Sequence, residues 1–216
     1  MIGFARVAFC ISLALPALPS QGATLFSTNA VWRFWKGTTE ASDPVEAWRK
    51  LNFDDSAWQQ GQSPLFYGDP LSGTELQDMR GLYSSVFFRR TFVVQDAAGV
   101  TQLDLDAYID DGCIVWINDV LVARINVNDG ITAFNGVASG AINEAGLPVK
   151  QSLTIPSPTT YLREGTNIIA VLGYNASLND SSDFQFSAAL RTAVADVIAP
   201  IITSKSPSPG TVSSLG

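Results

Sequence analysis

The chain has 216 residues, of which 13 are Lys or Arg and 20 are Asp or Glu, so its formal net charge is −7, and it contains no histidine. An acidic surface repels phosphate backbones, which argues against a nucleic-acid partner. The lack of histidine removes the commonest general base, the usual partner that activates a nucleophile, and the commonest zinc ligand.

Residues 1–22 are predicted to form a secretory signal peptide. A short start with one positive charge precedes an apolar run, Val7–Leu18, that is too short to span a bilayer, and small residues follow it. The protein is therefore expected to be secreted, either outside the cell or at its surface, with the periplasm as an alternative. Cleavage near residue 22 would remove Cys10 and leave Cys113 alone, so the fold is expected to rest on its core rather than on a disulfide.

Downstream of the signal peptide, apolar residues recur with a period of two, which is typical of half-buried antiparallel strands. Strands are predicted at Ser84–Val94, Thr101–Ile109, Thr166–Asn175 and Asp183–Val194. Val45–Phe53 could form one helical turn and no more, and no second apolar stretch is long enough to cross a membrane. Short strands broken by Gly, Pro, Asn and Asp predict an all-β antiparallel sandwich.

The segment Ile109–Ile125 is predicted to contain a β-hairpin that turns at Asn118-Asp119, since both residues tolerate positive φ. The expected cross-strand pairs are Ile117 with Val120, Trp116 with Leu121, Val115 with Val122, and Ile114 with Ala123. Every pair is apolar, so the hairpin is expected inside the sandwich. Trp116 and Cys113 are expected to be buried there.

Asp110, Asp111 and Gly112 stand in front of this hairpin and are expected to form the turn that enters it. A glycosidase pair is disfavoured because adjacent strand residues point to opposite faces. The spacing does not fit the D-x-D-x-D-G pattern of a calcium loop either. No metal or cofactor is therefore expected, with a loose calcium site of loop carbonyls and one Asp as an open alternative.

Long connections join some of the strands, and loops beyond about 12–15 residues are usually functional or disordered. The connections are Tyr67–Gly81, Asn126–Lys150 and the shorter Asn175–Asp183. Ala199–Gly216 shifts to Pro, Ser and Gly, as a linker would. We therefore expect a signal peptide (1–22), one sandwich domain (23–196) and a linker or the start of a further module (197–216), with the chain being part of a longer protein.

Several motifs together resemble the galactose-binding-domain-like β-sandwich, a jelly-roll module. It occurs as the N-terminal sugar-binding domain of family 2 glycoside hydrolases and in large secreted bacterial proteins. The matching pieces are Val31–Trp35, Ala47–Asp69, Val86–Val94, Ile109–Asp119, Tyr161–Asn175 and Ser182–Leu190. The resemblance implies a jelly-roll fold and a non-catalytic role. It carries over no sugar site, because ligand residues of this superfamily lie on variable loops. Asn118-Asp119 departs from the family's usual Asn-Gly.

Two of these motifs also predict structural turns. In FDDSAW, Asp54 and Asp55 are expected to make a turn that tucks Phe53 and Trp58 under the sandwich. In LREGTN, Gly165 is expected to form a tight turn before the long strand that follows it.

The sequence favours a non-catalytic carbohydrate- or ligand-binding module of a secreted bacterial multidomain protein. The candidate ligand residues are Tyr67 and Phe134 as stacking platforms, with Asp69 and Asn135 bonding sugar hydroxyls. The expected partners are a polysaccharide and further domains of the same polypeptide. The alternatives are a structural spacer without a ligand and, less favoured, an accessory domain of a glycoside hydrolase whose catalytic domain lies downstream. No catalytic residue is assigned, so this chain is not expected to be an enzyme.

Overall fold

The computed structural model describes residues 22–142 and 150–194. The predicted signal peptide up to residue 21, part of the second long connection (143–149) and the predicted linker lie outside the described residues. Within them, no helix is long and apolar enough to cross a membrane. The elements, in chain order, are β1 (Thr24–Phe26), β2 (Val31–Lys36), η1 (Ala47–Arg49), β3 (Gln59–Gln62), β4 (Leu65–Tyr67), β5 (Thr74–Glu75), β6 (Ser85–Val94), β7 (Val100–Asp110), β8 (Gly112–Ile117), β9 (Val120–Ile125), β10 (Lys150–Pro156), η2 (Pro158–Thr160), β11 (Gly165–Tyr174) and β12 (Phe184–Val194).

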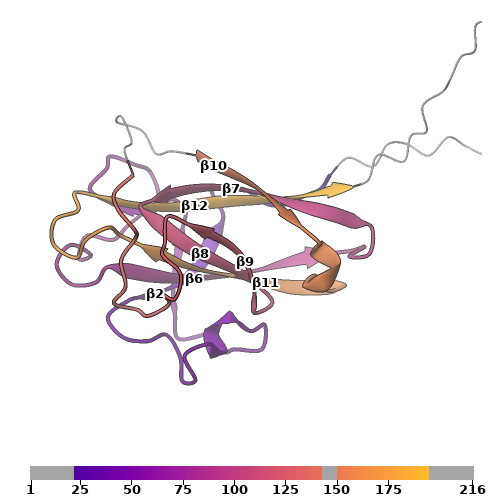
Figure 1. The fold of residues 1–216 in the computed structure, drawn as a ribbon, viewed down its shortest axis with the longest axis horizontal. Coiled ribbons are helices and arrows are strands. Elements are labelled where there is room, and N and C mark those ends of the chain that lie inside the picture. Colours follow the sequence, from indigo (N-terminus) through magenta and orange to yellow (C-terminus); the bar gives the residue numbers. More distant parts are fainter. Residues whose placement is uncertain (1–21, 143–149, 195–216) are drawn as a thin grey trace, which may run out of the picture. The chain divides into compact units, whose positions relative to one another are not determined.

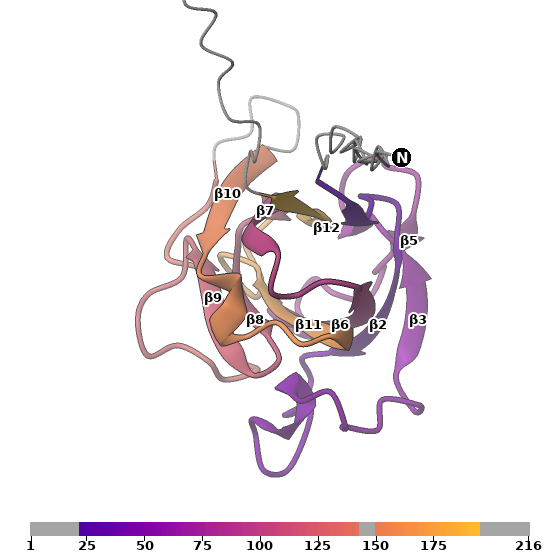
Figure 2. The ribbon, with the colours of Figure 1, turned by 90° about the vertical axis from the view of Figure 1, so that its right-hand side faces the viewer.

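The strands form two sheets that face each other (Figure 1; Figure 2). The first sheet has the order β10-β7-β12-β4-β5, with β1 pairing to β12, and the second has the order β3-β2-β6-β11-β8-β9. All pairs are antiparallel except β4 with β5. The predicted all-β antiparallel sandwich is confirmed, and the only helical segment near Val45–Phe53 is the single turn η1.

The main core lies between the two sheets and follows the alternation seen in the sequence. Leu103, Leu105 and Ala107, alternate residues of β7, are all buried in this core, in line with the period of two predicted for half-buried strands. Across the core, the ring of Phe88 on β6 stacks on that of Phe186 on β12, with centroids 4.0 Å apart. Aromatic packing of this kind joins the two layers of the sandwich.

A second apolar cluster covers the outer face of the β3–β9 sheet. Its buried members come from the strands and from two covering segments: Trp48, Trp58, Phe87, Ile114, Trp116, Val127, Ala138, Ala170, Leu172 and Tyr174. The segment with η1 lies outside this sheet in Figure 2. Strands of this sheet are therefore buried on both faces, and Trp58 and Tyr174 belong to this core rather than to an open surface.

Arg89 of β6 fastens the η1 segment onto the sheet. Its side chain is only 2% exposed, and its Nε donates to Asp55 Oδ2 at 2.7 Å. The two Nη atoms donate to three backbone carbonyls of the segment, those of Trp48, Lys50 and Phe53. A buried guanidinium needs such partners, since an unpaired buried charge costs several kcal/mol. Asp55 thus anchors this contact in addition to shaping a local turn.

The hairpin forms at the predicted turn, with positive φ at Asn118 (50°) and Asp119 (72°). The first two expected pairs are present, but a bulge after Val115 shifts the others, so Val115 opposes Ala123 and Ile114 opposes Arg124. The prediction that both strands are interior is wrong for β9. This strand is the edge of its sheet, and Val120 and Leu121 are 42% and 51% exposed.

Candidate functional site

The predicted ligand residues Tyr67 and Asp69 lie at the end of the sandwich where the long connections meet. Tyr67 is the last residue of β4 and is 7% exposed; its hydroxyl donates to Ser181 O (3.0 Å) and accepts from Asn175 Nδ2 (2.9 Å). Burial raises its pKa. Asp69 is half-buried, and burial together with the nearby Asp183 carboxylate raises its pKa. The ring of Tyr67 thus belongs to the core and presents no stacking face.

Phe134 and Asn135 come from the connection after β9, which reaches the same end of the domain. The half-buried ring of Phe134 packs against the second cluster, and its carbonyl accepts from the Ser85 hydroxyl. Asn135 is exposed. This connection touches the one after β11, because Ala138 N donates to Asn175 O at 3.0 Å. The long connections thus meet at this end of the domain, but they leave no exposed aromatic platform at Tyr67.

Asp111 is the residue that ties these connections together. Its carboxylate is 1% exposed and accepts backbone N–H groups from Ile142 (2.8 Å) and Ala176 (2.6 Å). Its own N–H donates to Tyr174 O, and its carbonyl accepts from Asn126 Nδ2. Both carboxylate oxygens are therefore committed to the backbone. Among the described residues, no group of three or more Cys, Asp or Glu is placed to hold a metal ion.

Asp111→Ala should lower the free energy of unfolding by about 1.5–3 kcal/mol, because two buried N–H groups lose a charged acceptor. Denaturant titration of the variant against wild type measures this loss. Asp54→Ala is the matched control, since the exposed Asp54 carboxylate is bonded by Ser56, two residues on, and its removal should matter less. Calcium that raises the melting temperature of wild type but not of Asp111→Ala would show instead that Asp111 is a metal ligand.

The two glycines assigned to turns are required for different reasons. Gly165 has φ of 80°, which lies in the region that favours glycine, and a Cβ added there would meet no atom within 4 Å. Gly112 is required by close approach, since its Cβ would lie 2.8 Å from Asn126 O. Glycine is thus favoured at position 165 by its positive φ, while at position 112 a side chain is excluded by the backbone of Asn126 in the same chain. Asp110, the last residue of β7, is 2% exposed.

Cys113 is fully buried in the main core, and burial raises the pKa of its thiol to about 12. Because the thiolate is the reactive form, a thiol-specific disulfide reagent at pH 8 should react only after denaturant is added. A Cys10→Ser background makes Cys113 the sole thiol for this measurement. Stoichiometric labelling within minutes in native buffer would contradict the buried placement of β8.

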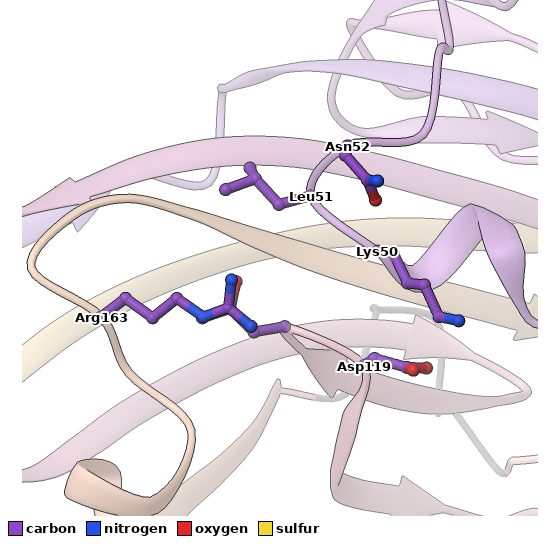
Figure 3. A pocket seen from close by; sticks show the side chains of 6 residues that line it. Lys50, Leu51, Asn52, Asp119 and Arg163 are labelled. Carbon is purple, nitrogen blue, oxygen red and sulfur yellow. The ribbon is translucent and has the colours of Figure 1, made fainter.

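A pocket of about 490 Å³ opens at the β8–β9 turn (Figure 3). It is lined by Lys50, Leu51, Asn52, Asn118, Asp119 and Arg163, which come from the segment after η1, the hairpin turn and the loop before β11. In Figure 3 Arg163 reaches into the pocket, and Asn52 turns its amide toward the same space. The volume lies within the range of about 300–1,000 Å³ that ligand sites occupy.

Hydrogen bonds from Asn118 fix the floor of this pocket. Its Nδ2 donates to Tyr161 O and to Asn167 Oδ1, both at 2.7 Å, while its Oδ1 accepts from Ile168 N. Asn167 in turn bonds both the N–H and the carbonyl of Arg163 at 2.8 Å. These hydrogen bonds hold the hairpin turn and the loop that carries Arg163 in a fixed position relative to each other without a ligand.

The charges in the pocket do not cancel. Asp119 pairs with Arg49 at 3.3 Å, and the Arg49 guanidinium lies over the Trp116 ring at 5.1 Å. Across the part of the chain that the structure describes, neither the Lys50 ammonium nor the Arg163 guanidinium has a hydrogen-bond or ion-pair partner. The charged groups that line the pocket therefore leave an excess of positive charge there, although the chain as a whole has a net charge of −7. Sequence reasoning did not select any of these residues for binding.

No family model matches the sequence, and no curated protein matches it significantly. Among solved structures, the chain superposes on a β-glucuronidase from Bacteroides uniformis with a TM-score of 0.52 and 18% identity, over 81% of this chain and 18% of that chain. A calcium-binding mutant of β-glucuronidase 2 from the same organism gives 0.50 and 20%, over 81% and 18%. A glycosyl hydrolase family 2 member from Bacteroides cellulosilyticus gives 0.48 and 18%, over 78% and 20%.

The two matches with TM-scores of 0.50 and 0.52 show the fold: the chain is an all-β sandwich like one part of these enzymes, in agreement with the sandwich that the sequence motifs predict. At such low identity the likeness concerns the fold alone. The chain spans about a fifth of the length of these enzymes, so it matches only a small part of each.

Proposed function

We propose that this chain is a non-catalytic carbohydrate-binding module of a secreted bacterial multidomain protein, and that the pocket at the β8–β9 turn is its binding site. The observation that carries the proposal is the pocket itself, which is built on three segments that hydrogen bonds hold in place. Secretion is inferred from the apolar N-terminal segment. Any catalytic activity is assigned to further domains of the longer protein.

The chemistry of the lining suits a sugar. Asn52, Lys50 and Arg163 bring hydrogen-bond donors to one space, and Leu51 adds an apolar surface beside them. Sugars present hydroxyl groups on an apolar ring, so a site for them combines a few polar groups with apolar contact. Because the Arg163 backbone is already fixed, binding orders little of the protein, which favours affinity.

The proposal is tested by affinity electrophoresis of the whole chain on plant and algal polysaccharides, both neutral and acidic. Asn52→Ala and Asn135→Ala form a matched pair, since both asparagines are exposed but only Asn52 lines the pocket. Retention that Asn52→Ala weakens and Asn135→Ala leaves unchanged supports the proposal. The reverse pattern moves the site to the end of the domain where the long connections meet.

A structural spacer is the second candidate function. The observation in its favour is the second apolar cluster, which commits the outer face of the β3–β9 sheet to packing rather than to a ligand. A chain that is retained by no polysaccharide on the panel would support the spacer and contradict the binding module.

A further inference from the structure

We infer that the pocket at the β8–β9 turn selects an anionic sugar, one that carries a carboxylate or a sulfate ester; this rests on the proposed function. The inference goes further because it names the chemical group that the site recognises. It starts from the arginine and lysine side chains of the described residues, because most of them have a partner and those of Lys50 and Arg163 do not.

Elsewhere in the domain the cations are mostly paired or hydrogen-bonded. Arg89 is bound by Asp55, Lys36 by Asp78 at 2.7 Å, and Arg191 by Asp106 at 2.8 Å. A second pocket, of about 340 Å³, is also lined by arginines, namely Arg33, Arg89 and Arg90, but each of them already donates to backbone carbonyls. Those side chains already bond the protein's own backbone, so they have fewer donors left for a ligand in that pocket.

Lys50 and Arg163 differ from these cations in that their backbones are held while their charged ends are not. Lys50 O accepts from Arg89 Nη1 at 3.1 Å, and Asn167 bonds both backbone groups of Arg163. The carboxylates nearby are already engaged: Asp119 pairs with Arg49, and Glu164 accepts the N–H of Ala97 at 3.0 Å. Two cations on fixed supports therefore line one cavity, and no described residue supplies a counter-ion to either. In Figure 3 the Arg163 guanidinium points into this space, and the Lys50 ammonium lies on the side of Asp119.

An anion on a sugar would complete this arrangement. The planar guanidinium of Arg163 can donate two parallel hydrogen bonds to a carboxylate or a sulfate, and the Lys50 ammonium adds a point charge. The Asn52 amide and Leu51 are left for the hydroxyls and the ring of the same sugar. A neutral sugar would leave both charges unpaired, so the charged group should account for much of the affinity.

Matched polysaccharides test the inference. Polygalacturonate is compared with its fully methyl-esterified form, and dextran sulfate with dextran, so the members of each pair share a sugar backbone and differ in whether it carries an anionic group. The whole chain should bind at least one charged member about tenfold or more tightly than its neutral partner. That preference should shrink between 50 and 500 mM NaCl because salt screens exposed charges. Which pair shows it distinguishes a carboxylate from a sulfate ligand.

Arg163→Gln and Lys50→Gln should each weaken binding of the charged polysaccharide about fivefold to tenfold and hardly affect neutral ones. Arg80→Gln makes the same change in net charge on an exposed side chain that bonds Asn179 O, far along the chain from the pocket, and should leave binding unchanged. All three variants should melt like wild type, since none of these side chains is buried.

The outcomes separate the two proposals. Equal binding of charged and neutral partners, or equal losses in Arg80→Gln and Arg163→Gln, overturns the anionic selectivity and leaves carbohydrate binding in place. Binding to no polysaccharide at all overturns both. A charged preference that both pocket variants abolish and Arg80→Gln retains supports the inference.

Discussion

Arg89→Met should lower the free energy of unfolding by about 3–5 kcal/mol, which is the usual cost of removing one partner from a buried ion pair. The variant removes the donors that the carbonyls of Trp48, Lys50 and Phe53 now share, and it leaves Asp55 without its 2.7 Å partner. Methionine fills similar space but donates no hydrogen bond. Denaturant titration with an unchanged slope would report the loss directly.

Arg33→Met is the matched control for this prediction. Arg33 is on β2, beside Arg89 in the sheet, and lies 3.9 Å from the same Asp55 carboxylate, but its side chain is 34% exposed. An exposed pair contributes about 0–1 kcal/mol, and the hydrogen bond from Arg33 Nη1 to Trp58 O (3.1 Å) adds about 1 kcal/mol, so this variant should lose clearly less stability than Arg89→Met. Arg89→Lys should recover only part of the loss because an ammonium cannot reproduce the planar fork of donors. Equal losses at Arg33 and Arg89 would contradict the anchoring role of Arg89.

Trp116→Ala should destabilise the domain by about 3–5 kcal/mol, as removal of a buried aromatic ring usually does. Trp116 is 3% exposed, packs edge-to-face on Trp48 with centroids 5.5 Å apart, and carries the Arg49 guanidinium over its ring. Its loss would open a cavity beneath η1 and loosen the segment that forms one wall of the pocket. The melting temperature and the denaturant midpoint should fall together.

Leu121→Ala is the control here, because Leu121 is the cross-strand partner of Trp116 and is 51% exposed. Its substitution should change stability by no more than about 0.5 kcal/mol, the usual range for surface positions. A soluble Trp116→Ala variant with an unchanged denaturant midpoint would show that the second apolar cluster does not stabilise the fold.

The sandwich could be predicted from the sequence because the residues of its main core alternate along each strand with a period of two. Alternation in Thr101–Ile109 placed Leu103 and Leu105 inward, and the Asn118-Asp119 turn fixed the start of the hairpin register. The bulge after Val115 and the exposed edge position of β9 were missed. Both depend on which strands neighbour β8 and β9 in the sheet, and hydrophobic period alone does not determine that.

The second cluster and the pocket were missed for a related reason. Arg89 holds the segment that carries Trp48 and Asp55 on the outer face of the sheet, through bonds between residues more than thirty positions apart. Lys50 and Arg163 are farther apart still, and only the sheet order brings their loops to one turn. The available signal was two basic residues flanking turns in an acidic chain, which is a weak pattern without the topology. The candidates Tyr67 and Phe134 instead followed loop length, which does not report burial.

The placement of the binding site is tested most directly by titrating the ¹⁵N-labelled chain with oligogalacturonate and following its backbone amide resonances. We predict that the amides of Lys50, Asn52, Asp119 and Arg163 shift with one common saturation curve, while those of Asn135 and Ala176, at the end where the long connections meet, stay in place. Saturable shifts at Asn135 and Ala176 with none at the pocket would contradict the proposed site.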